Sequence, residues 1–178
     1  MFKYRRKVIR DNIERSFPQQ SADWYNRIES EYYLHFADIT VESIKHFTID
    51  NETAMSRMKH VNSEAFKPFF EAGKSVLIAG GHLNNWELYA VTANQNVPHD
   101  VMAVYKKLSD PTMEHAVLES RQRFGLEMVR TIDAQAWMQE HAQGSRPKAI
   151  VMGFDQSPAN PKKAWWTSFL HQETAWYY

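Results

Sequence analysis

A histidine and a glutamate near the middle of the chain have the types and spacing of a proton-transfer pair. Four residues separate His82 from Glu87. We expect Glu87 to lie in the first turn of a helix capped by Asn84 or Asn85, where free amides and the helix dipole favour a carboxylate. Side chains in a first turn lean toward the N-terminus, so Glu87 is expected to point at the loop carrying His82. The pattern predicts an imidazole–carboxylate pair suited to general-base catalysis.

The spacing by itself is weak evidence. The chain has eight His and 21 acidic residues, so about one such match is expected by chance, and this is the only one. On spacing alone, the simpler interpretation makes Glu87 a capping carboxylate and His82 an ordinary loop residue. The surroundings favour the functional interpretation, because an apolar run and a break at Gly80 and Gly81 precede the pair. Open α/β sheets bind their ligands at such strand ends.

The elements that must position this pair alternate between strands and helices. Residues 76–79 are apolar and rich in branched side chains, and we expect a strand buried on both faces. Further strands are expected at 100–105, near 128–129 and at 149–154, separated by helices of about 10 to 15 residues. This alternation implies crossover connections and therefore an α/β fold with a largely parallel sheet flanked by helices.

Polar residues follow three of the expected strands. His82 follows the first strand, Lys106 the second, and Asp155 and Gln156 the fourth. Because the carboxyl ends of parallel strands lie at one edge of a sheet, we expect these side chains to border one cleft. The sequence thus predicts a base, a cation and a carboxylate–carboxamide pair around a common site.

The part of the chain before the strands is expected to be mainly helical. Residues 1–16 suit a short amphipathic helix whose cations are Lys3, Arg5, Arg6, Lys7 and Arg10. Such a helix is typical of attachment to an anionic membrane surface, and a solvated helix face is an equally good interpretation. A second helix is expected from residue 21 to about residue 46, with apolar positions at a helical period that are mostly core.

Composition argues against several classes of function. Basic and acidic residues balance at 21 each, which leaves no overall field to attract a nucleic acid, and we expect no such partner. The chain has no Cys, so disulfides, thiolate metal sites and cysteine nucleophiles are excluded. The eight His are scattered without ligand-like pairing, and no metal site is expected. No run approaches the ~18 apolar residues of a membrane span.

Short blocks spread over nearly the whole chain add a resemblance to a known family. The blocks are residues 4–8, 16–18, 33–38, 81–87, 104–106, 121–125, 155–158 and 169–170. In this order they resemble the late acyltransferases of lipid A biosynthesis, within the larger group of glycerolipid acyltransferases with a His-x4-acid motif. The ordered blocks are more specific than the single histidine–glutamate spacing. They imply a glycerolipid acyltransferase-like α/β fold preceded by an N-terminal helical region.

The resemblance also implies an activity. A fatty acyl group would pass from an acyl carrier protein thioester to a hydroxyl of a lipid A precursor or related glycolipid, at the cytoplasmic face of the bacterial inner membrane. No cofactor is implied beyond this donor. His82 would be the general base and Glu87 its orienting partner. The residues implied to bind substrate or support the site are Asn85, Trp86, Lys106, Arg121, Asp155 and Gln156.

Two departures from the family pattern add expectations. Members usually carry a hydrophobic anchor before the first block and continue well beyond the last one. We therefore expect a truncated member with a single acyltransferase-like domain over residues 1–178, attached peripherally to the membrane. Within it, residues 1–73 would form a helical entry region and 74–178 an α/β catalytic portion, incomplete at its C-terminus. The alternatives are an inactive fragment that binds lipid or the membrane surface, and a hydrolase in which the same pair activates water.

Overall fold

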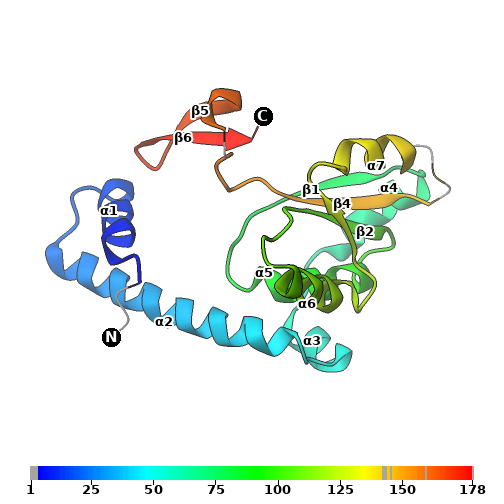
Figure 1. Ribbon diagram of the computed structural model, residues 1–178, viewed down its shortest axis with the longest axis horizontal. Coiled ribbons are helices and arrows are strands. Elements are labelled where there is room, and N and C mark those ends of the chain that lie inside the picture. The colour runs from blue at the N-terminus through cyan, green and yellow to red at the C-terminus, as the bar shows by residue number, and fades with distance from the viewer. Residues whose placement is uncertain (1–3, 142–143, 145, 159, 178) are drawn as a thin grey trace. The chain divides into compact units, whose positions relative to one another are not determined.

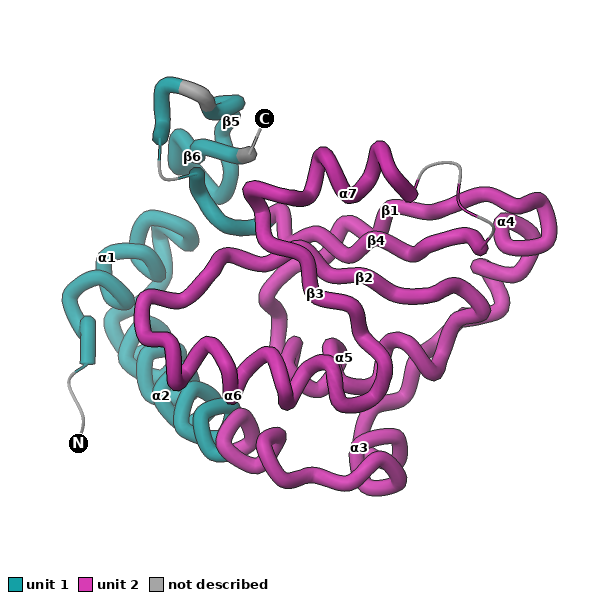
Figure 2. Tube along the Cα trace, turned by 45° about the vertical axis from the view of Figure 1, so that its right-hand side comes forward, with its two compact units in different colours: residues 1–41, 155–178 teal, residues 42–154 magenta. Residues whose placement is uncertain are grey.

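The computed structural model describes residues 4–141, 144, 146–158 and 160–177 (Figure 1). Its elements, with 3-10 helices labelled η, are α1 (Arg6–Ser16), α2 (Ala22–His46), α3 (Asn51–Arg57), η1 (Ser63–Phe66), α4 (Lys67–Glu71), β1 (Val76–Gly80), α5 (Trp86–Thr92), η2 (Ala93–Gln95), β2 (Asp100–Tyr105), α6 (Pro111–Gln122), β3 (Glu127–Arg130), α7 (Ala134–His141), β4 (Lys148–Gly153), η3 (Pro161–Lys163), β5 (Ala164–Phe169) and β6 (Gln172–Tyr177). They form two compact units, one of residues 42–154 and the other of residues 1–41 and 155–178 (Figure 2). The expected single functional domain over the whole chain stays a prediction.

The unit of residues 42–154 is built on a parallel sheet. Its strands follow the order β1-β4-β2-β3, and every pairing is parallel. The register places Gly80 of β1 opposite Gly153 of β4, and Ala103 of β2 opposite Val151 of β4. The carboxyl ends of the first, fourth and second strands are therefore neighbours. The predicted α/β fold with a parallel sheet and an N-terminal helical region is confirmed.

Helices cover the two faces of this sheet. Helices α5 and α6 lie on one side and α7 lies on the other (Figure 2). On the α5 face, a buried cluster is centred on Val101 and Ala149, and Ile78 and Val151 pack against it. On the opposite face, Met102 is fully buried in a second cluster with residues of α7. The alternating strand positions thus belong to two separate cores, as expected for a sheet between helices.

Strand β1 corrects one prediction. Residues 76–79 were expected to be buried on both faces, but Leu77 is 58% exposed. The burial of β1 alternates from residue to residue. The reason is its position, because β1 ends the sheet order, whereas the cluster around α7 is built on β2, β3 and β4. The apolar composition of a strand therefore did not distinguish an edge strand from a central one.

Helix α6 is fastened to the end of α2. The backbone carbonyl of His46 accepts hydrogen bonds from Ser120 Oγ at 3.1 Å and from Arg123 Nη2 at 2.8 Å. The last carbonyls of a helix have no partner within the helix, so these bonds supply one. The chain then turns at Gly125, whose φ of 95° suits glycine, and an added Cβ would meet Asn94 Nδ2 at 2.6 Å. The α6–β3 connection is thereby held in one conformation.

The second unit contains α1, most of α2 and a C-terminal hairpin. Arg6 and Arg10 of α1 form ion pairs with Glu29 of α2, whose side chain is largely buried. Part of the expected cationic surface helix therefore packs on α2, and Lys3 lies outside the described residues. Strands β5 and β6 pair antiparallel, with Leu170 and His171 at positive φ between them. No helix in the described part of the chain is long and apolar enough to cross a membrane.

Candidate active site

The loop after β1 carries His82 and ends at the cap of α5. Asn84 adopts the left-handed conformation, with a φ of 50°, which turns the chain into the helix. Asn85 is the cap, because its Oδ1 accepts a hydrogen bond from the amide of Leu88 at 2.9 Å. Its Nδ2 donates to Glu42 Oε2 at 2.5 Å. The predicted capping role of an asparagine is confirmed for Asn85, and both ends of its amide hold the loop in place.

The imidazole of His82 lies between an aromatic ring and a strand backbone. Its ring meets the Trp86 indole edge-on, with centroids 5.4 Å apart and an interplanar angle of 72°. On the β4 side, a Cβ added to Gly153 would lie 2.8 Å from Cε1 of His82. A glycine in a strand often marks such a close approach. The missing side chain at position 153 therefore makes room for the His82 ring.

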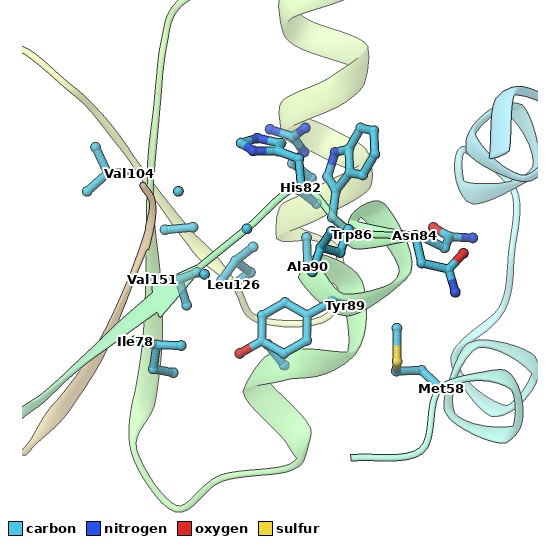
Figure 3. Close-up of a pocket in the computed structure, with 18 of the residues that line it drawn as sticks. Met58, Ile78, His82, Asn84, Trp86, Tyr89, Ala90, Val104, Leu126 and Val151 are labelled. Atoms are coloured by element: carbon cyan, nitrogen blue, oxygen red, sulfur yellow. The ribbon is translucent and has the colours of Figure 1, made fainter. Parts of the chain in front are cut away.

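An apolar cavity opens beside His82. Its volume is about 560 Å³, and it lies at the carboxyl edge of the sheet between the strands and α5. Figure 3 shows His82 and Trp86 at one end of the cavity and Ile78 and Tyr89 at the other. Most of the wall is apolar, and Val151 is among its residues. Its size is typical of pockets for small molecules.

The carboxylate of Glu87 is bound by a residue from another helix. Arg121 of α6 donates from Nε to Glu87 Oε2 at 2.9 Å, and from Nη2 to Glu87 Oε1. Each of the two side chains is only 22% exposed. Bidentate pairs of this kind combine strength with geometric specificity. The pair fixes the direction of Glu87 at the start of α5.

A buried histidine lies near the same carboxylate. His46 is 5% exposed, and its Nδ1 has no hydrogen-bond partner among the described residues. Burial lowers the pKa of His46 from its usual value, although the charges of Glu87 and Glu42 act in the opposite direction. Desolvation disfavours the imidazolium form. The neutral side chain therefore adds no positive charge that would compete with Arg121 for Glu87.

Comparison with protein families decides the assignment. The model of the bacterial lipid A biosynthesis acyltransferase family matches residues 1–175. The chain belongs to this family. The resemblance predicted from the ordered sequence blocks is confirmed, and with it the classification as an acyltransferase. No curated protein matches the chain in a sequence search.

The structure of this lipid A acyltransferase family member brings part of the predicted site together. His82, Asn85, Trp86 and Arg121 all line the apolar cavity. Glu87 lies in the first turn of α5 and binds Arg121. Its pairing with His82 and the substrate-binding roles stay predictions. Arg121 has an additional role that the sequence did not indicate, because its guanidinium holds a carboxylate of the protein.

Three further predicted site residues follow strands β2 and β4. Lys106 follows β2, is exposed, and is not among the described residues that line the cavity. Asp155 and Gln156 follow β4 in a bend that belongs to the unit with residues 1–41. Their binding roles stay predictions.

The sequence analysis missed several residues of the candidate site. Met58 and Tyr89 line the cavity, and Gly153 backs His82. Tyr89 follows Trp86 by three residues, so helical spacing places both on one face of α5, which is a usable signal. A glycine at the end of an apolar strand is a weaker signal for Gly153. Nothing in the sequence points to Met58, because it comes from a segment between α3 and η1.

Proposed function

We propose that this chain transfers a fatty acyl group from an acyl carrier protein thioester to a hydroxyl of a lipid A precursor or related glycolipid. One observation supports the proposal most: His82 stands at the mouth of an apolar cavity in a member of this acyltransferase family. The donor, the glycolipid acceptor and attachment to the cytoplasmic face of the bacterial inner membrane are parts of the proposal. Membership of the family supports these parts of the proposal.

In the proposed reaction His82 is the general base. Its imidazole takes the proton of the acceptor hydroxyl while that oxygen attacks the thioester carbonyl carbon. The new C–O bond forms, the C–S bond breaks, and the proton passes from the imidazolium to the departing thiolate. A positioned base of this kind contributes ~10²- to 10⁴-fold to the rate. No nucleophile from the protein is required, which agrees with a chain without Cys.

Glu87 is the orienting partner in this proposal. A carboxylate that orients an imidazole also stabilises the imidazolium that forms during the reaction. Arg121 binds both Glu87 oxygens, which restricts the carboxylate to one direction. We therefore assign Arg121 a positioning role through Glu87, in addition to the predicted contact with substrate.

The apolar cavity is the proposed site of the acyl chain. Ile78, Ala90, Leu126 and Val151 line it, and each offers only apolar side-chain atoms. Burial of a methylene group contributes about 0.8 kcal/mol, so a fatty chain is held strongly in such a space. The thioester carbonyl at the head of the chain would then lie near His82, which Figure 3 shows at one end of the cavity.

The test is acyl transfer by purified protein with an acyl carrier protein donor and a glycolipid acceptor. We expect His82→Ala to lower the transfer rate by about 10²-fold or more. His115→Ala is the matched control, because His115 is 85% exposed on α6 and should leave the rate unchanged. A His82→Ala rate equal to that of the parent would refute the mechanism. Release of free fatty acid without transfer would identify a hydrolase instead.

A further inference from the structure

A second cavity lies against the far end of the first. It has a volume of about 410 Å³ and is lined mainly by apolar side chains, among them Phe66, Val97 and Val101. The residues that line both cavities are Met58, Ile78, Tyr89 and Ala93. The two spaces are therefore separated by a thin wall of side chains.

Tyr89 is the largest side chain in this wall. In Figure 3 its ring lies at the end of the first cavity opposite His82 and Trp86. It is partly buried and packs against the core cluster on the α5 face of the sheet. A chain that entered beside His82 and extended along the cavity would therefore meet the Tyr89 ring before it reached the second cavity.

The Tyr89 ring is held in position by its neighbours. It stacks on the His60 ring, with centroids 5.3 Å apart and an interplanar angle of 29°. His60 Nε2 lies 2.8 Å from Thr92 Oγ1, and that hydroxyl donates to the Leu88 carbonyl at 2.8 Å. Since the Thr92 hydroxyl proton is used in this bond, His60 Nε2 is the donor to Thr92. Thr92 is fully buried, so His60 is anchored to α5 and braces the tyrosine.

We propose that the stacked pair of Tyr89 and His60 closes the acyl cavity and sets the longest acyl chain that the enzyme accepts. The second cavity is the space that a longer chain would occupy if the ring were removed. This inference rests on the proposed function, because it takes the first cavity as the acyl site. It adds the residue that determines chain-length specificity.

The test compares donors of increasing length, from decanoyl to stearoyl acyl carrier protein, on Tyr89→Ala and the parent. We expect the optimum to move to a longer chain. We compare the transfer rate with the first donor longer than the parent's best donor to the rate with that best donor. This ratio should rise about 10-fold in Tyr89→Ala, since one or two methylenes in an apolar pocket change rates by about that factor. Tyr89→Phe keeps the ring and should keep the parent's optimum. A folded Tyr89→Ala protein with an unchanged optimum would overturn the proposal.

A core truncation elsewhere controls for general loosening. Met138 packs in the cluster on the opposite face of the sheet, so Met138→Ala should lower stability without moving the optimum. If Tyr89→Ala does not fold, Tyr89→Leu takes its place in the experiment, because leucine also removes the aromatic ring. An equal shift of the optimum in Met138→Ala would also contradict the assignment to Tyr89.

A binding measurement separates this inference from the proposed function. Calorimetric titration with laurate and palmitate needs no turnover. Tyr89→Ala should raise the affinity for palmitate relative to that for laurate by about 10-fold, whereas Tyr89→Phe should not change this ratio. If the parent transfers no acyl group but this shift occurs, the proposed function fails and the cavity inference holds. If the parent transfers acyl groups but neither the chain-length optimum nor the affinity ratio shifts in Tyr89→Ala, the cavity inference fails and the proposed function stands.

Discussion

Arg121 of α6 donates hydrogen bonds to both carboxylate oxygens of Glu87. The two residues are far apart in sequence and meet because α6 packs beside α5 and is tied to the end of α2 through the His46 carbonyl. Arg121 therefore connects the packing of three helices to the direction of one acidic side chain beside the loop of His82. The proposed mechanism depends on that direction.

Removal of Arg121 should weaken both stability and transfer. Arg121→Ala leaves a largely buried carboxylate without its partner, and we expect the free energy of unfolding to fall by about 1.5 to 3 kcal/mol. Transfer should fall by about 10²-fold, because a small misplacement of an orienting group is costly. Arg121→Lys keeps the positive charge but cannot bind both carboxylate oxygens in the same way. Its stability and transfer rate should lie between those of the parent and those of Arg121→Ala. Urea denaturation and steady-state kinetics measure the two effects.

An exposed arginine provides the control for this experiment. Arg130 pairs with Asp133, and their side chains are 44% and 48% exposed. Arg130→Ala should change the free energy of unfolding by no more than about 1 kcal/mol. It should leave transfer as in the parent. Equal activity losses in the two alanine variants would argue against a positioning role for Arg121.

A methyl group at position 153 should disable the base without unfolding the protein. The added Cβ of Gly153→Ala would lie 2.8 Å from His82 Cε1, so the imidazole must move. His82 is exposed, and the ring can swing toward solvent at small cost in stability. We expect about a 10²-fold loss of transfer, with a thermal midpoint close to that of the parent. Gly80→Ala is the comparison, because its Cβ would meet only Met152 O at 3.8 Å and should cost far less activity.

The cap of α5 should matter more for activity than a cap elsewhere. Asn85→Ala removes the bond to the Leu88 amide and should cost about 1 kcal/mol of stability. Asp110 caps α6 through the Met113 amide at 2.8 Å, so Asp110→Ala should cost a similar amount. Only the Asn85 variant loosens the loop that carries His82. Similar stability losses with unequal activity losses would support this account, and equal activity losses would count against it.

Stability should fall as the solution becomes mildly acidic. Burial lowers the pKa of both His46 and His60 below the usual 6.5, the value expected in the unfolded chain. Well above pH 6.5 both histidines are neutral in either state. As the pH falls below 6.5, the unfolded chain binds protons that the folded protein does not, so stability is lost until the folded pKa is reached.

Denaturation between about pH 7.5 and about pH 5.5 checks this effect. We expect His46→Gln and His60→Gln each to flatten the dependence of the unfolding free energy on pH. His115→Gln should leave the dependence unchanged, because that side chain is exposed. A parent protein whose stability does not change over this interval would show that neither His46 nor His60 stays neutral.

Much of the secondary structure and the parallel sheet could be predicted, because the sequence signals for them are local. The apolar runs, the glycine breaks and the position of Asn85 before α5 are each encoded within a few residues. Helix α2 begins and ends close to its expected bounds for the same reason. The parallel sheet follows from the alternation of strands and helices.

The remaining features depend on contacts between distant segments. Leu77 is exposed because β1 is an edge strand, and the order of strands in a sheet cannot be inferred from the sequence of one strand. The C-terminal hairpin turns at Leu170 and His171, both at positive φ. That turn usually carries Asn or Gly, so the sequence held no hairpin signal. The resemblance implied that Arg121 contacts substrate, and nothing local in the sequence indicated that its guanidinium binds Glu87.

Chemical rescue tests the role of His82 most directly. The side chain is exposed at the mouth of the cavity, so His82→Gly leaves a space that added imidazole can enter. We predict that this variant loses acyl transfer by about 10²-fold or more, and that imidazole restores a substantial part in a concentration-dependent way. A His82→Gly enzyme that transfers acyl groups at the parent rate without imidazole would contradict the account.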